Sequence, residues 1–279
     1  MKEVKMQKFG KLVLGIAICF WILPVMAKPY PKEDVLPDQL VMATLWHQTA
    51  AEYRAIAYQT FNLARVMLDM ELQKQTAKQK AIVLDLDETL LDNSPYQAMV
   101  VIKQTGYPHG WFEWIDAAQA GAIPGAVEFL KYADAKGVAI IYLSNRKITK
   151  DRKIPGMQNT LKNMRALGFP QADESHMYLR NASSSKQSRR DEIATKFDII
   201  MLFGDNLNDH DVIFEHKGVA ERLAAVDANQ KEFGHRYFVL PNAMYGEWEG
   251  AVYDYQWRKS TAEKSQMRKA ALNAWEPKQ

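Results

Sequence analysis

Short apolar runs alternate with longer stretches of helical periodicity along most of the chain. Four runs have the length of buried strands, at residues 81–84, 138–143, 199–203 and 236–240. Apolar residues with helical spacing occupy about 39–72, 126–135, 155–167, 186–196 and 218–227. Strands that alternate with helices predict an α/β fold in which a parallel sheet carries helices on both faces.

The first helical segment, at about 39–72, predicts one buried apolar stripe. The stripe consists of Tyr53, Ile56, Ala57, Ala64, Met67 and Leu68. A terminal helix is also expected, with a solvated face that bears Arg258, Lys259, Lys264, Arg268 and Lys269. Its buried side is expected to be formed by Met267, Ala271 and Leu272. Between the first strand and the helix 126–135, residues 93–125 look irregular because they contain several Gly and Pro residues.

Two of the predicted strands end in pairs of acidic residues. Asp85 and Asp87 follow the run 81–84, while Asp205 and Asp209 lie in the sequence GDNLND after the run 199–203. In an open α/β sheet, ligands bind in the crevice at the carboxyl ends of the strands. Crowded carboxylates repel each other unless a cation or a shared proton neutralises them, so the pattern indicates a metal site. A lone D-x-D is also common in turns, and only the combination is specific.

Three further polar residues complete this pattern. Ser144 and Asn145 follow the strand 138–143, and Lys186 opens the helical segment 186–196. A serine at a strand end is often only a turn former, and most lysines are solvated surface charges. Lys147 and Lys153 compete with Lys186 for the role of a buried cation.

In this order, the motifs DLDET, YLSNR, a lysine and GDNLND resemble the four-motif signature of the haloacid dehalogenase-like phosphatases. The closer resemblance is to the class C acid phosphatases, the lipoprotein-e type of 5'-nucleotidase. It extends from about residue 37 to the C-terminus through AEYRAIAYQTFN, DETLLDNSPY, IPGAVEFL and LPNAMYGEWEG. The resemblance implies a Rossmann-like three-layer parallel sheet, the haloacid dehalogenase-like fold, with a small, mainly helical cap region at about 93–125.

The resemblance also implies roles for the residues at the strand ends. Asp85 would attack phosphorus to form an aspartyl-phosphate, and Asp87 would act as general acid and base. Ser144 and backbone N–H groups near Asn145 would bind the phosphoryl oxygens. Lys186 matches the lysine of the third motif and would neutralise the phosphate.

The implied cofactor is Mg²⁺, which prefers oxygen ligands. Asp85, the backbone carbonyl of Asp87 and Asp205 would bind the ion, and Asp209 would bind it directly or through water. His210 stands where relatives usually have Phe, and it is compatible with either titration near neutrality or plain packing.

Aromatic residues indicate which group the phosphate of the substrate is attached to. Tyr245 and Trp248 in MYGEWEG are candidates for stacking a nucleobase, with Trp111 and Trp114 near the same entrance. A Gly-rich turn with ordinary core aromatics remains the alternative.

Residues 1–27 have the pattern of a secretory signal peptide, with Lys2, Lys5, Lys8 and Lys11 before an apolar run of 14 residues. Cleavage is expected after Ala27, which leaves a single phosphatase domain at 28–279 that is periplasmic or secreted. The whole chain has 36 basic and 33 acidic residues. The leader takes four lysines and one glutamate, so the rest has 32 of each and no basic footprint for nucleic-acid polymers.

The single cysteine, Cys19, lies inside the leader, so no disulfide framework is expected. The lipoprotein-e relatives carry a small residue before a lipidated cysteine, whereas Ile18 precedes Cys19 here. Release is therefore favoured over an outer-membrane lipoprotein, and membrane contact is expected only if the leader is retained or lipidated.

The sequence therefore predicts a Mg²⁺-dependent phosphomonoesterase that hydrolyses nucleoside monophosphates and related small phosphate monoesters. Two alternatives stay open at this point. One is an acid phosphatase without nucleotide preference or with a preference for sugar phosphates. The other is a non-enzymatic surface-binding protein on the same fold, like plant storage relatives of these phosphatases. The family often forms homodimers, which the resemblance implies for this chain as well.

Overall fold

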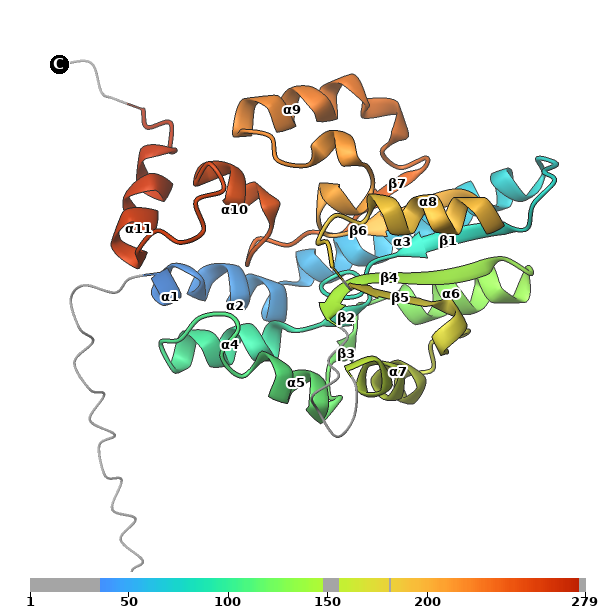
Figure 1. The fold of residues 1–279 in the computed structure, drawn as a ribbon, viewed down its shortest axis with the longest axis horizontal. Helices are drawn as coiled ribbons and strands as arrows, with labels where there is room; N and C mark the ends of the chain where they lie inside the picture. Colours follow the sequence, from blue (N-terminus) through green and yellow to red (C-terminus); the bar gives the residue numbers. More distant parts are fainter. Residues whose placement is uncertain (1–35, 148–155, 181, 276–279) are drawn as a thin grey trace, which may run out of the picture. The chain divides into compact units, whose positions relative to one another are not determined.

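A five-stranded parallel sheet forms the centre of the protein (Figure 1). The computed structural model describes residues 36–147, 156–180 and 182–275, which belong to one compact unit. The strands are β1 (Lys80–Leu84), β4 (Ala139–Lys147), β5 (Met177–Arg180), β6 (Asp198–Gly204) and β7 (Tyr237–Val239). Their order is β5-β4-β1-β6-β7, so the chain leaves β1 first to one side and later to the other. The predicted parallel α/β architecture is confirmed.

Both faces of the sheet are apolar. Successive side chains of a strand point to opposite sides, so each strand contributes to both cores. In β1, Ile82 and Leu84 join one core cluster, whereas Ala81 and Val83 join the other. Burial on both faces explains why the central strands read as continuous apolar runs in the sequence.

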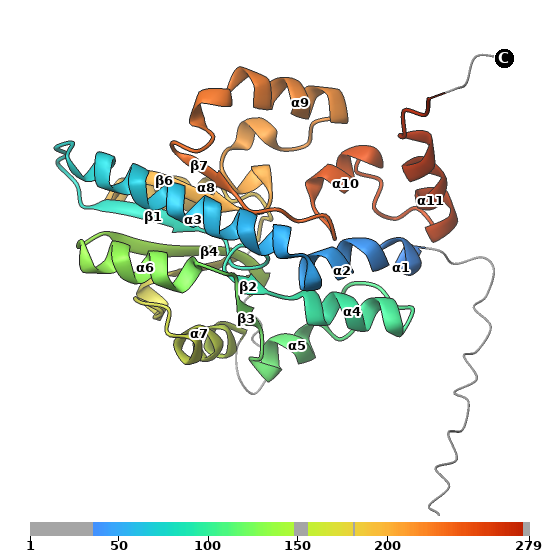
Figure 2. The same ribbon diagram turned by 180° about the vertical axis from the view of Figure 1, so that it is seen from behind.

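Helices cover the two faces in separate layers (Figures 1 and 2). Side chains of α3 (Ala51–Leu72), α6 (Ala126–Ala135) and α7 (Gly156–Leu167) belong to the first core cluster. The second cluster includes or packs against α8 (Gln187–Lys196), α9 (Val219–Ala228) and the short 3₁₀ helix η3 (Val212–Phe214). Three further 3₁₀ turns are η1 (Glu174–His176), η2 (Leu207–Asp209) and η4 (Gln230–Glu232).

The segment between β1 and α6 is more regular than the sequence suggests. It contains a two-stranded antiparallel sheet of β2 (Leu91–Asp92) and β3 (Gly121–Ala122) and the helices α4 (Ser94–Ile102) and α5 (Trp111–Ala117). The prediction of a mainly helical region at 93–125 is confirmed, whereas the reading of it as irregular is wrong. Helices of seven and nine residues are too short for a clear periodic signal.

The predicted helix at 39–72 consists of three pieces. The short α1 (Leu36–Gln39) and α2 (Val41–Thr49) precede α3, and Ala50 between α2 and α3 has an extended backbone. This break brings the Trp46 and His47 rings to within 5.5 and 4.0 Å of Tyr53, measured between centroids. Tyr53, Ala57, Ala64 and Leu68 are buried as predicted, while Met67 is partly buried and Ile56 is 38% exposed. Phe61, which was not included in the predicted stripe, is buried in the core, whereas Ile56 is not.

Other elements differ in detail from the predictions. The strand β5 was not predicted, and β4 extends four residues beyond the predicted end at 143. After α10 (Glu247–Val252), the terminal helix α11 (Thr261–Ala270) is present. Its buried residue is Ser265, whereas Ala271 and Leu272 lie beyond its end and are exposed. Arg268 is not merely solvated, because it pairs with Glu249 and contacts Tyr253.

The predicted leader and Lys153 lie outside the described residues, and the boundary of the phosphatase domain at residue 28 stays a prediction. Within the described ranges, no helix combines the length and the apolarity that crossing a bilayer requires.

Candidate active site

Three of the predicted acids meet at the carboxyl end of the sheet. Asp85 follows β1, Asp205 follows β6, and Asp209 ends η2. One carboxylate oxygen from each lies within 4.8 Å of the others. The backbone N–H of Asp85 continues the β1–β6 ladder by donating to the carbonyl of Phe203 at 3.0 Å, which fixes the start of the loop. β1 lies between β4 and β6, so the acids occupy the point at which the strand order reverses.

Lys186 is the buried cation of this cluster, as the sequence predicts. Its ammonium group donates to the carboxylate of Asp85 and lies 2.7 Å from Oδ1 of Asp209. The competing Lys147 is exposed at the end of β4. Three carboxylates with one ammonium leave two negative charges, a balance that suits a divalent cation.

The pKa values reflect this crowding. Burial raises the pKa of Asp85 from 3.8 to about 7, against the opposing effect of Lys186, and Asp209 adds to the rise. Burial and the charges of Asp209 and Asp85 raise the pKa of Asp205 well above its ordinary value. Burial acts to lower the pKa of Lys186, but the two carboxylates prevail and raise it. The carboxylates are therefore costly to ionise without a cation.

The residues fit a hard divalent metal ion. All three possible ligand atoms of the cluster are carboxylate oxygens, which suit Mg²⁺, Ca²⁺ or Mn²⁺ rather than softer metals. Asn242 donates to Oδ2 of Asp205 at 2.8 Å and so holds that carboxylate in orientation. Such outer contacts to a ligand are typical of metal sites.

Gly204 allows Asp209 to approach the end of β6. A Cβ atom at residue 204 would lie 2.3 Å from Cβ of Asp209 and 2.5 Å from its Oδ2. These distances are far inside van der Waals contact, so the glycine is required here by space rather than by backbone conformation.

Ser144 and Asn145, which are predicted to bind the phosphate, lie in the last part of β4 and are hydrogen-bonded to α8. Ser144 is fully buried, and its hydroxyl accepts a hydrogen bond from the backbone N–H of Arg146 at 3.1 Å. Arg189 donates to the backbone carbonyl of Ser144 and to the side chain of Asn145, each at 2.7 Å. Arg190 donates to the carbonyls of Asn208 and Asp209. Successive basic residues of α8 thus connect the end of β4 with the turn η2 that follows β6.

Asp87 lies apart from the three clustered carboxylates. Its carboxylate accepts hydrogen bonds from the guanidinium of Arg146, the shortest at 2.7 Å, and from the side chain of Asn93 at 2.9 Å. The side chain of Asp87 is therefore not grouped with Asp85, Asp205 and Asp209 as a ligand. A contribution to a metal site is left to its backbone carbonyl.

Two of the predicted substrate residues lie together near the first motif. The hydroxyl of Tyr245 donates to Glu88, a fully buried residue with a positive φ of 59°. Burial and the charges of Asp87 and Asp205 raise the pKa of Glu88 well above its ordinary value. Trp248 is 45% exposed, and its indole N–H donates to the carbonyl of Tyr245 at 3.3 Å. The hydroxyl of Tyr245 thus lies beside the loop that follows β1.

Trp111 and Trp114 of α5 contact the residues that surround Asp87. The ring of Trp111 lies 5.7 Å from the guanidinium carbon of Arg146 and 5.0 Å from the ring of Tyr96. The indole N–H of Trp114 donates to Asn93 at 2.8 Å. Both tryptophans therefore border the site, although on the side of Asp87.

His210 is a packed residue. It is buried, and its Nε2 lies 3.2 Å from the carbonyl oxygen of Phe238. Burial lowers the pKa of the imidazole, against the charge of Asp209. Of the two readings of this histidine, the structure favours packing.

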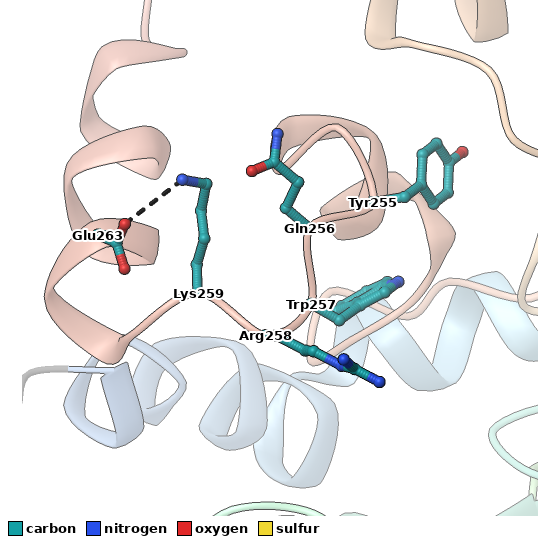
Figure 3. A pocket seen from close by; sticks show the side chains of 6 residues that line it. All are labelled: Tyr255, Gln256, Trp257, Arg258, Lys259 and Glu263. Carbon is teal, nitrogen blue, oxygen red and sulfur yellow. Dashed lines mark hydrogen bonds and ion pairs between the residues drawn. The ribbon is translucent and has the colours of Figure 1, made fainter.

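A surface groove of about 610 Å³ lies between α10 and α11 (Figure 3). It is lined by Tyr255, Gln256, Trp257, Arg258, Lys259 and Glu263. None of these residues belongs to the acid cluster, so the groove is separate from the candidate active site.

Comparison with known proteins agrees with this fold. The sequence model of the HAD superfamily, subfamily IIIB (Acid phosphatase), matches residues 10–248. The chain belongs to this acid phosphatase family.

Among solved structures, the chain is similar to the class C acid phosphatase from Bacillus anthracis and to the tungstate-bound form of that enzyme. In each case the identity is 45% and the TM-score is 0.82, with 86% of this chain and 99% of the other covered. It also resembles the stem 28 kDa glycoprotein of Glycine max, which is 24% identical over 254 residues, or 85% of this chain and 86% of the glycoprotein. The predicted acid phosphatase class is confirmed.

Sequence reasoning missed several residues of the site. Arg146 was within the YLSNR motif and Asn93 within DETLLDNSPY, but neither was given a role. Arg189, Arg190 and Asn242 act only through side chains that come together in three dimensions. In the sequence, only their proximity to a motif indicates that these residues belong to the site.

Proposed function

We propose that this acid phosphatase hydrolyses 5'-nucleotides and related phosphate monoesters through an aspartyl-phosphate formed on Asp85, with Mg²⁺ as its cofactor. The observation that carries the proposal is the contact of one buried ammonium, that of Lys186, with both Asp85 and Asp209 at the end of the sheet. This arrangement offers a nucleophile, a cation for the phosphate and a metal site within a few ångströms.

In the first half of the reaction, a carboxylate oxygen of Asp85 attacks phosphorus. The new bond from Asp85 to phosphorus forms as the bond from phosphorus to the leaving oxygen breaks, and the carboxyl of Asp87 gives that oxygen its proton. Ser144 and the N–H groups near Asn145 bind the phosphoryl oxygens, and Lys186 neutralises their charge. The alcohol then leaves.

In the second half, Asp87 accepts a proton from water, and the water oxygen attacks phosphorus. The bond from phosphorus to Asp85 breaks, which releases inorganic phosphate and restores both carboxyl groups. Asp85, Asp205, Asp209 and the backbone carbonyl of Asp87 would hold Mg²⁺, which would supply positive charge to stabilise the phosphoryl transition state. The tungstate-bound form of the relative from B. anthracis supports a site for tetrahedral oxyanions in this family.

The preference for nucleotides rests on Tyr245 and Trp248. The hydroxyl of Tyr245 is tied to Glu88, and Trp248 presents a half-exposed indole next to it. Two aromatic residues joined by a hydrogen bond, one of them tied to the loop after β1, suit the stacking of a flat base, whatever its identity. The broad acid phosphatase remains the second candidate, because stacking alone does not require a nucleotide.

We also propose that the protein is exported, on the sequence pattern of residues 1–27, and that the mature form is periplasmic or secreted. Formation of a homodimer stays a prediction from the resemblance.

Phosphate release from 5'-AMP, nicotinamide mononucleotide, a sugar phosphate and p-nitrophenyl phosphate tests this function. Turnover with Mg²⁺ that disappears in EDTA is expected, with higher kcat/KM for the two nucleotides. Replacing Tyr245 by alanine should lower kcat/KM for nucleotides by roughly tenfold, in line with about 1–3 kcal/mol per stacked base. Equal rates for nucleotides and the sugar phosphate would instead favour the broad phosphatase.

The effect of metal removal on stability should depend on pH. In the metal-free protein, Asp85 and Asp205 have raised pKa values, so the folded state holds protons that the unfolded chain has released. Their contribution to stability is complete below the ordinary pKa of about 4 and is lost as the pH rises through their raised pKa values, which for Asp85 is about 7. Bound metal removes this loss, so we expect EDTA to lower Tm more at about pH 7.5 than at about pH 5. A Tm difference that is independent of pH would contradict the assignment of the metal site.

A further inference from the structure

Asp87, the proposed proton donor, has several hydrogen-bond donors around its carboxylate. Its side chain is 18% exposed, whereas that of Arg146 is 3% exposed. Oδ1 accepts from Nη2 of Arg146 at 2.7 Å, from Asn93 at 2.9 Å and from Nε of Arg146 at 3.0 Å. Among the residues that the structure describes, Oδ2 accepts only a longer contact from Nε, at 3.2 Å. The two oxygens of Asp87 are therefore not equivalent.

Arg146 is itself held in place. Its Nη1 donates to the hydroxyl of Thr160 in α7 at 3.1 Å, and Thr160 in turn donates to the carbonyl of Gly156 at 2.8 Å. Nη2 also lies 3.4 Å from Oδ1 of Asn93, and the ring of Trp111 lies beside the guanidinium. The planar group thus has a fixed orientation between β4, α7 and the region of α5.

The second donor to Asp87 is held in the same way. Asn93 is fully buried, and its Oδ1 accepts from the indole N–H of Trp114 at 2.8 Å. Its backbone N–H donates to Glu88 at 2.9 Å. The side chain of Asn93 therefore has no freedom to turn away from Asp87, and both donors to Asp87 connect to α5.

A buried ion pair of this kind is weak evidence for stability, because desolvation offsets most of the attraction. Its distinctive property is geometric, since a guanidinium fork fixes the plane of the carboxylate that it binds. From this geometry, and on the basis of the function proposed above, we infer that Arg146 is the positioning residue for Asp87. Together with Asn93 it occupies Oδ1, and it leaves Oδ2, which has a single longer contact, as the oxygen that exchanges a proton with the leaving group and with water.

The inference predicts a dependence on the leaving group. An alkyl alcohol is a poor leaving group that needs a proton as the bond to phosphorus breaks, whereas a dinitrophenolate leaves without one. A change that misplaces Asp87 should therefore slow alkyl esters selectively, whereas a general loss of structure should slow all esters alike.

The experiment measures kcat/KM for glycerol 2-phosphate and for 2,4-dinitrophenyl phosphate with the full Mg²⁺-loaded protein. For Arg146→Met we expect a loss of roughly 100-fold with the alkyl ester and less than about tenfold with the aryl ester. Arg146→Lys keeps the charge but loses the fork, and it should show the same selectivity to a smaller degree. It also serves as the informative variant if Arg146→Met folds poorly.

Arg189→Met is the matched control. Arg189 is also a buried arginine next to the site, but its contacts are with Ser144, Asn145 and Ser185 rather than Asp87. Its loss should slow both esters by similar factors, because phosphate binding is common to both.

Asp87→Asn separates failure of this inference from failure of the proposed mechanism. If Asp87→Asn slows the alkyl ester selectively and the Arg146 variants slow both esters equally, the positioning role of Arg146 is overturned. If Asp87→Asn itself shows no selectivity, Asp87 is not the proton donor, and both the mechanism and the inference are overturned.

Discussion

Asp85→Asn should abolish turnover, with kcat reduced by roughly 10⁴-fold or more, while the protein still folds. The amide has nearly the shape of the carboxylate but cannot attack phosphorus. Burial and the neighbouring acids already disfavour the charged form of Asp85, since they raise its pKa to about 7. Removing that charge should leave the metal-free protein at least as stable as the wild type. Phosphate release and thermal unfolding in EDTA measure the two effects.

Asp173→Asn is the matched control for Asp85→Asn. Asp173 caps the turn η1 on the surface, where asparagine is an equally good cap, so full activity is expected. Substantial turnover by the Asp85→Asn protein would rule out the aspartyl-phosphate route. Such a result would leave the metal-binding residues to activate water directly.

Lys186→Met should weaken the binding of phosphate without weakening the binding of Mg²⁺. The ammonium of Lys186 contacts Asp85 and Asp209, and its loss leaves these buried carboxylates unpaired. In EDTA, we expect destabilisation of about 3–5 kcal/mol, which added Mg²⁺ largely restores. Product inhibition by inorganic phosphate should weaken, and kcat should fall by roughly 100-fold or more. Mg²⁺ affinity should stay equal or increase, because a competing cation has been removed.

Lys147→Met removes an exposed lysine from the end of β4 and serves as the control for charge. It should change neither phosphate inhibition nor stability by more than a few tenths of a kcal/mol. If the two lysine variants behave alike, Lys186 acts only through the overall charge of the protein.

The acids and Ser144 were predictable because strand ends determine where they lie. In a parallel sheet, the residue after each buried run emerges at the same edge, so the positions of Asp85, Asp205 and Ser144 follow from three apolar runs. Lys186 required the resemblance to a known family, since a lysine before a helix has many solvated alternatives. The structure brings Lys186 to Asp85 and Asp209 as that resemblance implies.

The partners of Asp87 were not predictable in the same way. Arg146 and Asn93 reach Asp87 only because β4, α7 and α5 pack around it, and no spacing in the chain encodes that arrangement. The break at Ala50 has a similar origin. No Gly or Pro marks it, and it is stabilised by the packing of Tyr53 against Trp46 and His47. Tertiary contacts override local propensity at both places.

The hydrogen bond from Lys186 to Asp85 joins residues that are 101 positions apart in the chain. During synthesis, the segment with DLDET is complete long before the helix that carries its cation has been made. An extended chain therefore contains every acid of the site but no place for a phosphate, and a nascent chain that has not reached Lys186 also lacks Asp205 and Asp209. Hydrolysis is therefore confined to the folded molecule, and a chain that is still unfolded cannot consume phosphate esters.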